Sequence, residues 1–76
     1  MKKEVFLEKL KEAIETDQLI DENTVLKNIS EYSSLTILSI IALIDENFGK
    51  NLTAKELNSI SSVKSLMDLI GIDQFE

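Results

Sequence analysis

Residues 34–49 constrain the fold more than any other part of the chain. Their apolar side chains recur every three or four positions, which is the period of an α-helix. One stripe of this predicted helix gathers the side chains expected to face a core: Ile37, Ile40, Ile41, Ile44 and Phe48. The neighbouring face is also partly apolar, because Leu35 and Leu38 lie on it. A helix with two apolar surfaces is expected to use one of them for something other than the core.

Two further helices are predicted on either side of this segment. Residues 3–15 place apolar side chains at helical spacing, with lysines and glutamates between them. Thr53 followed by Glu56 matches a capping box, which predicts a short helix that begins at Thr53 and ends near Ser59.

A last helix completes the predicted fold. Ser61 or Ser62 can cap it at its start, and Gly71 is placed to end it. No proline interrupts the chain, and 76 residues suffice for one modest core. The sequence therefore predicts an all-α fold in a single domain over residues 1–76: a small four-helix bundle with three longer helices and a short third one.

Residues 16–33 lose the helical periodicity and collect polar residues, so a long ordered loop is predicted there. Loops longer than about 12–15 residues are uncommon in compact domains unless they serve a function. The apolar residues of this loop are expected to anchor it on the bundle: Leu19, Ile20, Val25, Leu26 and Ile29.

Composition excludes several kinds of chemistry. The chain has no Cys and no His, which leaves no disulfide, no thiolate or imidazole metal site and no His-based catalysis. We therefore predict that the protein is not an enzyme and binds no metal. Its net charge of −6 disfavours nucleic acid and anionic membranes and favours partners with basic surfaces.

The sequence also predicts the localisation of the protein. Its longest apolar run, residues 37–44, is interrupted by Ser39 and is too short to span a bilayer. Lys2 and Lys3 are followed by further charged residues rather than by the apolar stretch of a signal peptide. We expect a soluble, cytoplasmic protein that is a monomer.

The start of the central helix reads Glu31-Tyr32-Ser33-Ser34-Leu35. It resembles the prosthetic-group attachment site of acyl carrier proteins, in which an Asp-Ser-Leu triplet opens the second helix of a small acidic bundle. The likeness covers essentially the whole chain, with matching blocks at residues 44–49, 60–63 and 68–70 and a long loop before the second helix. It is closest to carriers that are dedicated to one pathway.

This resemblance implies that Ser34 carries 4'-phosphopantetheine, transferred from coenzyme A by a phosphopantetheinyl transferase. The thiol of that group would hold acyl intermediates as thioesters for enzymes of fatty-acid, polyketide or specialised biosynthesis. A helix start suits the phosphate, because free backbone N–H groups and the helix dipole favour an anion there. Ser33 stands where the family has Asp, so slower modification by a general transferase is expected. Alternatively, Ser33 and Ser34 form only an N-cap pair.

The resemblance also implies a surface for partner enzymes. The partners would be an acyl or aminoacyl ligase, or acyltransferases and synthases, with basic docking surfaces. Leu35 and Leu38 are expected to be apolar anchors, while Asp45 and Glu46 steer basic residues. The whole predicted surface comprises Leu35, Leu38, Ser39, Ala42, Asp45, Glu46 and Glu56. Without the resemblance, Asp45 and Glu46 read equally well as a solvated helix end.

Carriers of this family can also shelter an acyl chain between their helices. The side chains expected to line such a pocket are Ile37, Ile41, Leu57, Ile60 and Leu66. The simpler interpretation is that all five belong to the core.

Two other functions remain open at this point. An aminoacyl or peptidyl carrier protein would have the same features, because the sequence does not show the cargo. A helical interaction module that kept the fold and lost the modification is a second alternative, which Ser33 strengthens.

Overall fold

The computed structural model describes all residues from 1 to 76, and it confirms the predicted all-α fold with a short third helix. Its elements follow in chain order as α1 (Lys3–Ile14), η1 (Leu26–Asn28), α2 (Ser34–Phe48), α3 (Ala54–Ser59), α4 (Val63–Ile70) and η2 (Ile72–Gln74), where η denotes a 3₁₀ turn. The two 3₁₀ turns were not expected from the sequence. No helix combines the length and the apolar character needed to cross a membrane.

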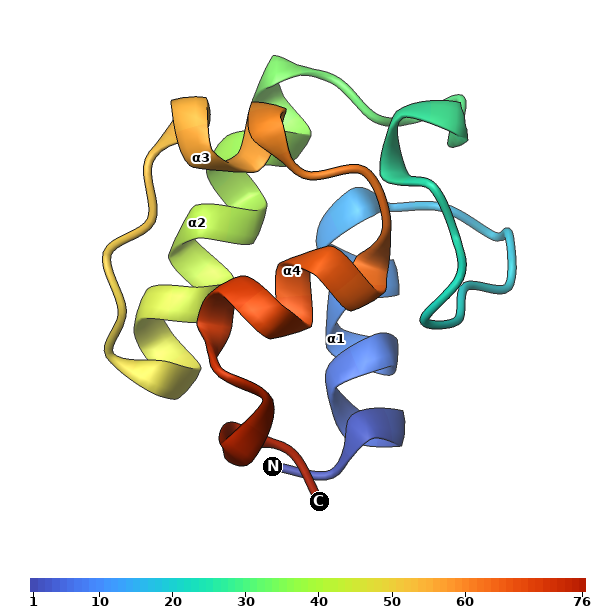
Figure 1. The fold of residues 1–76 in the computed structure, drawn as a ribbon. Coiled ribbons are helices and arrows are strands. Elements are labelled where there is room, and N and C mark those ends of the chain that lie inside the picture. The colour runs from blue at the N-terminus through green and yellow to red at the C-terminus, as the bar shows by residue number, and fades with distance from the viewer.

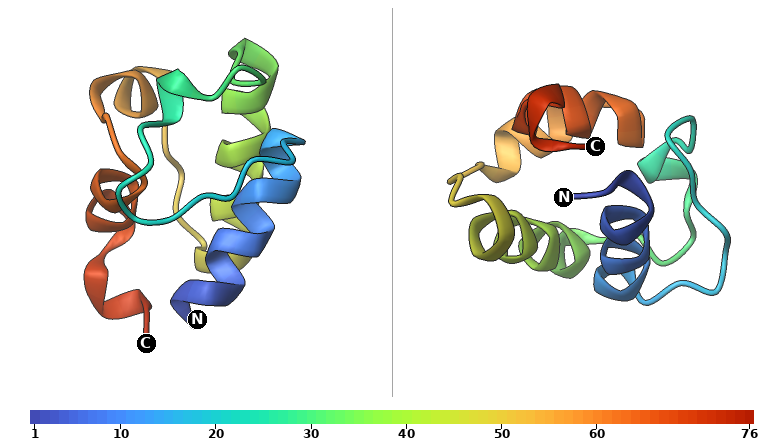
Figure 2. Two further views of the ribbon diagram at one scale, coloured as in Figure 1. Left: turned by 90° about the vertical axis from the view of Figure 1, so that its right-hand side faces the viewer. Right: turned by 90° about the horizontal axis from the view of Figure 1, so that it is seen from below.

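The helices form two layers around one core. α1 and α2 lie side by side in one layer, and α3 and α4 cover them from the other side (Figures 1 and 2). Fifteen buried apolar side chains fill the space between the layers: Phe6, Leu10, Ile14, Leu26, Ile29, Ile37, Ile40, Ile44, Leu52, Leu57, Val63, Leu66, Met67, Ile70 and Phe75. Every element except η2 contributes to this core, so the core fixes the position of each helix.

The longer helices of the first layer end at residues with left-handed backbone. α1 stops at Glu15, which has φ 62°, and its N–H still bonds to the Lys11 carbonyl. α2 stops at Gly49, with φ 66°, whose N–H bonds to the Asp45 carbonyl. Glycine adopts this conformation without steric cost, whereas Glu15 adopts it against a penalty. The sequence therefore predicted the end of α2 and placed the end of α1 one residue too late.

Side-chain caps set the starts of the second layer. Thr53 and Glu56 form the predicted capping box, in which each side chain accepts a hydrogen bond from the backbone N–H of the other. Ser62, not Ser61, caps α4 and accepts from the Ser65 N–H at 3.2 Å. These caps satisfy N–H groups that would otherwise lack partners in helices of only six and eight residues.

The long loop is tied to the start of α4 by backbone hydrogen bonds. The Leu26 N–H donates to the Ser61 carbonyl at 3.1 Å, and the Val63 N–H donates to the Thr24 carbonyl at 2.9 Å. The loop thereby crosses from the end of α1 to the second layer and returns to the start of α2, as the left view of Figure 2 shows. Its course therefore depends on partners far away in the sequence.

Only part of the predicted loop anchoring is correct. Leu26 and Ile29 are buried, whereas Leu19 is 86% exposed and Val25 is also exposed. Leu19 lies just after a turn in which Thr16 Oγ1 accepts the N–H two residues later at 3.1 Å. Leu19 therefore does not anchor the loop, whereas the next residue, Ile20, is half-buried against the core.

One end of the bundle is closed by three aromatic rings. Phe6 packs edge to face against Phe48 and Phe75, with ring centroids 5.9 and 5.0 Å away. The termini lie side by side at this end (Figure 1), where the Glu76 N–H donates to the Met1 carbonyl at 3.0 Å. Aromatic pairs in this geometry add to the stabilisation from buried area.

Candidate functional site

Hydroxyl groups fix the start of α2. Ser33 has extended backbone, and its Oγ accepts a hydrogen bond from the Thr36 N–H at 3.4 Å. The buried Thr36 hydroxyl donates to the Glu31 carbonyl oxygen at 3.0 Å. Because that proton is already used, the 3.3 Å bond between Ser33 Oγ and Thr36 Oγ1 uses the proton of Ser33. Ser33 is therefore the N-cap of α2.

Ser34 is the first residue of α2, and it is exposed. The side-chain hydrogen bonds at this helix start belong to Ser33 and Thr36, so the Ser34 hydroxyl is available to a molecule from outside. It also lies beside the backbone N–H groups of a first helical turn, which favour a phosphate. An exposed hydroxyl in this position fits attachment of a phosphate ester such as phosphopantetheine.

The charged residues of α2 lie only near its C-terminal end, and their sign is unfavourable there. α1 has the stabilising order, with Glu4 in its first turn and Lys11 in its last. α2 has no acidic residue in its first turn and no basic residue in its last. Instead, the exposed Asp45 and Glu46 lie near its C-terminal end, where the dipole is negative. Stabilising α2 is therefore not the role of these two carboxylates.

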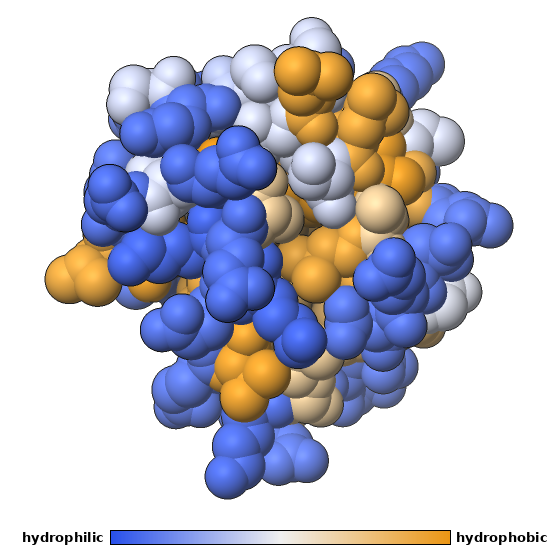
Figure 3. Space-filling model, turned by 180° about the vertical axis from the view of Figure 1, so that it is seen from behind, coloured by the Kyte–Doolittle hydropathy of each residue, from blue (hydrophilic) through white to orange (hydrophobic).

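Two leucines of α2 project from the bundle. Leu35 is 76% exposed and Leu38 is 60% exposed. Figure 3 shows apolar side chains gathered on the back face of the molecule, at the end where α2 begins. Ser39 and Ala42 on the same face are exposed as well. The second apolar surface predicted for this helix is thus a solvent-facing one, next to Ser34.

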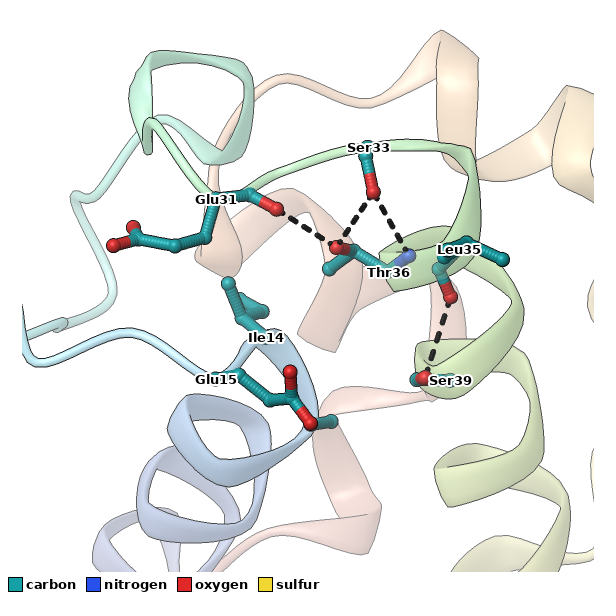
Figure 4. Close-up of a pocket in the computed structure, with 8 residues that line it drawn as sticks. Ile14, Glu15, Glu31, Ser33, Leu35, Thr36 and Ser39 are labelled. Carbon is teal, nitrogen blue, oxygen red and sulfur yellow. Dashed lines mark hydrogen bonds between the residues drawn. The ribbon is translucent and has the colours of Figure 1, made fainter.

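The structure contains one cavity, of about 440 Å³, between the end of α1 and the start of α2. Eight residues form its wall: Ala13, Ile14, Glu15, Glu31, Ser33, Leu35, Thr36 and Ser39. In Figure 4, Ile14 and Glu15 of α1 lie across from Thr36 and Ser39 of α2. The Ser39 hydroxyl donates to the Leu35 carbonyl at 3.2 Å, so it retains only acceptor capacity toward the cavity.

Glu31 also borders this cavity. Hydrogen bonding from the Thr16 hydroxyl lowers the pKa of Glu31, and its own backbone N–H and the Ser30 hydroxyl act in the same direction. The Ser30 hydroxyl is 3.2 Å from Glu31 Oε1. The Glu31 side chain points away from Thr36 in Figure 4, while its carbonyl points toward it. Glu31 is therefore an anion that also positions the start of α2.

The structure separates the residues of the predicted partner surface. Leu35, Leu38, Ser39, Ala42, Asp45 and Glu46 share the exposed side of α2. Glu56 lies on α3, where its carboxylate accepts hydrogen bonds from both the N–H and the hydroxyl of Thr53. The α2 residues thus form one continuous surface, whereas Glu56 serves the cap of its own helix.

The residues expected to line an acyl pocket lie in or next to the core and do not border the cavity. Ile37, Leu57 and Leu66 are buried core residues, and Ile41 and Ile60 are half-buried against them. An acyl chain would reach these five side chains only if the core opened. Their role as a pocket stays a prediction.

Sequence reasoning did not find the cavity itself. Ala13 and Ser39 are small residues that line the gap from α1 and from α2, and Ala13 is the sequence signal that could have indicated it. The gap depends on the separation between the end of α1 and the start of α2, which no local pattern specifies.

No protein-family model matches the chain, and no curated protein or solved structure is significantly similar to it. The residues around Ser34 and the exposed surface of α2 are therefore the features that bear on function.

Proposed function

We propose that the chain is an acyl carrier protein that bears 4'-phosphopantetheine on Ser34 and presents acyl groups to partner enzymes. The observation that carries this proposal is the exposed Ser34 hydroxyl at a helix start that has no acidic residue in its first turn. The resemblance of the segment from Glu31 to Leu35 to the carrier attachment site supports the same assignment.

The modification is a simple transfer to the hydroxyl oxygen. A bond forms between Ser34 Oγ and the phosphorus of the phosphopantetheine moiety of coenzyme A, while the pyrophosphate bond to that phosphorus breaks. Adenosine 3',5'-bisphosphate leaves, and the hydroxyl proton passes to a base of the transferase or to water. Once attached, the group supplies the thiol that holds acyl groups as thioesters.

The chain's own residues then hold and present the arm. Backbone N–H groups of the first turn of α2 stabilise the phosphodiester, and Ser33 keeps that turn in place without adding a second negative charge. Leu35 and Leu38 supply apolar contact to an arriving enzyme, and the acidic end of α2 steers basic surfaces toward it.

The test is modification in solution. Wild-type protein is incubated with coenzyme A, Mg²⁺ and a broad-specificity phosphopantetheinyl transferase, and its intact mass and fragment ions are measured. We expect one phosphopantetheine on Ser34, none on Ser34→Ala, and retained modification of Ser33→Ala, in which only the cap is lost. Modification elsewhere, or none while a control carrier is fully converted, would contradict the proposal.

The exposure of Leu35 and Leu38 also suits a second candidate, a helical interaction module that is never modified. In that case Ser34→Ala would behave as wild type in the host cell. An aminoacyl or peptidyl carrier differs from the first proposal only in cargo, which loading assays with purified ligases distinguish.

A further inference from the structure

We propose that the cavity between α1 and α2 is a docking site for the pantetheine portion of the arm on Ser34, which it holds while no partner enzyme is bound. The inference rests on the function proposed above and adds a ligand to a cavity that this function does not require.

The position of the cavity makes the arm its natural ligand. Ser33 and Leu35, the two neighbours of Ser34 in the chain, both line the wall. An arm attached to Ser34 therefore starts at the rim. Tethering on a short linker gives an effective concentration of about millimolar, so even a weak site would be occupied for much of the time.

The size of the cavity is also suitable. Its volume of about 440 Å³ is within the range of roughly 300–1,000 Å³ that is typical of small-molecule sites. Pantetheine is a flexible chain with two amides, a hydroxyl and a pair of geminal methyl groups. A site for pantetheine therefore needs a few polar groups for the amides and the hydroxyl, and a small apolar surface for the methyl groups.

The polar groups of the wall are mainly acceptors. The hydroxyl protons of Thr36 and Ser39 are already donated to the carbonyls of Glu31 and Leu35, and the Glu15 carboxylate can only accept. Amide N–H and hydroxyl donors of the arm match this arrangement. The phosphate does not, because the Glu15 carboxylate repels it, so it stays outside at the start of α2.

The apolar part of the wall is small, which favours the arm over an acyl chain. Only three of the eight residues that line it are hydrophobic: Ala13, Ile14 and Leu35. The geminal methyl groups of the arm need only a small apolar contact of this kind. A long alkyl chain would instead cover polar groups of the wall without offering them hydrogen bonds, which is unfavourable.

The arm's thiol provides a direct readout, because the chain has no Cys and the arm would carry its single thiol. We would measure the rate of alkylation by iodoacetamide, a neutral reagent, in wild-type holo-protein and in holo-Ala13→Leu. The added side chain occupies part of the cavity and so competes with the arm for it. Ala54→Leu, at an exposed residue of α3 that lies outside both the cavity wall and the partner surface of α2, is the matched control.

We expect the rate to rise about threefold or more in Ala13→Leu and to stay at the wild-type value in Ala54→Leu, since the rate follows the undocked fraction. Equal rates in all three proteins would overturn the docking proposal. In wild-type holo-protein, nuclear Overhauser contacts from the arm to the Ala13 methyl should be present, and their absence would also overturn it. The nuclear Overhauser measurement uses only the wild-type protein, so it does not depend on whether a variant folds.

The two proposals fail in different ways. If no phosphopantetheine is attached to Ser34, the proposed function fails before alkylation is measured. If the mass shows full modification but alkylation and nuclear Overhauser contacts show a free arm, only the docking proposal fails.

Discussion

At one end of the bundle, Phe6, Phe48 and Phe75 interlock and the two termini are joined by a backbone hydrogen bond. At the other end, α2 begins beside a cavity, and Leu35 projects into solvent. The first end is closed by side-chain packing, and the second is held by hydrogen bonds of Ser33 and its neighbours. α2 runs from one end to the other, so a single helix is shared by both.

This difference indicates that the two ends of α2 contribute differently to stability. Buried aromatic contacts are worth several kcal/mol, whereas exposed apolar side chains contribute little to stability. The closed end therefore stabilises the fold more than the start of α2 does, where Leu35 and Leu38 are exposed. Local conflicts between stability and sequence are expected at functional sites.

The largest effect on stability should come from removing an aromatic ring at the closed end. Phe6→Ala removes a fully buried ring that contacts both other phenylalanines, and we expect it to lower the free energy of unfolding by about 3–5 kcal/mol. Urea denaturation measures this loss. Phe6→Leu leaves a smaller cavity and should lower the free energy of unfolding by less. A loss below about 1 kcal/mol in Phe6→Ala would contradict the view that the closed end stabilises the fold.

At the open end, truncation should affect binding and spare stability. Leu35→Ala and Leu38→Ala should change the free energy of unfolding by less than about 0.5 kcal/mol. If both are binding anchors, each should weaken productive binding of the phosphopantetheinyl transferase by about 1 kcal/mol or more, which is roughly a fivefold higher KM. Val5→Ala, at an exposed apolar residue of α1, is the control and should leave KM unchanged.

The acidic residues near the C-terminal end of α2 predict a smaller effect, in which their removal stabilises the protein. Asp45→Asn and Glu46→Gln remove negative charge from the C-terminal end of the helix, so each should stabilise the protein by about 0.3–1 kcal/mol. Both should slow association with a basic partner at low salt. Glu4→Gln, in the first turn of α1, should instead destabilise the protein. Destabilisation by the α2 variants would show that their carboxylates serve the fold.

The smallest effect concerns pH at the rim of the cavity. The pKa of Glu31 is lowered in the folded state, so its charged form stabilises the fold above the ordinary value of 4.5 and this contribution is lost as the pH falls through the lowered pKa. The stability difference between wild type and Glu31→Gln should therefore be present at neutral pH and vanish in acid. Urea denaturation at several pH values measures it, with Glu12→Gln on α1 as the control for charge. A difference that persists unchanged in acid would contradict this role.

Much of the fold was predictable because its signals are local. The capping box of Thr53 and Glu56, the stop at Gly49 and the helical spacing of α2 each depend on neighbours within four residues. Phe75 was missed, because its burial depends on Phe6 at the other end of the chain. Leu19 was wrongly predicted to be an anchor, because an apolar residue in a loop does not show by itself whether its side chain reaches the core.

The candidate site was predictable to a similar extent. The exposed positions of Ser34, Leu35 and Leu38 follow from the period of one helix, and the structure places them on the solvent side. The cavity required the position of Ala13 on another helix. Helical periodicity identifies which residues share a face, but it does not specify the gap between two helices.

The most direct test of the account is the intact mass, with fragment ions, of the protein isolated from the cells in which it is naturally made. The account predicts a single phosphopantetheine attached to Ser34, alone or with an acyl group on its thiol. A chain that is unmodified at Ser34 under all growth conditions would contradict it and would favour the unmodified interaction module.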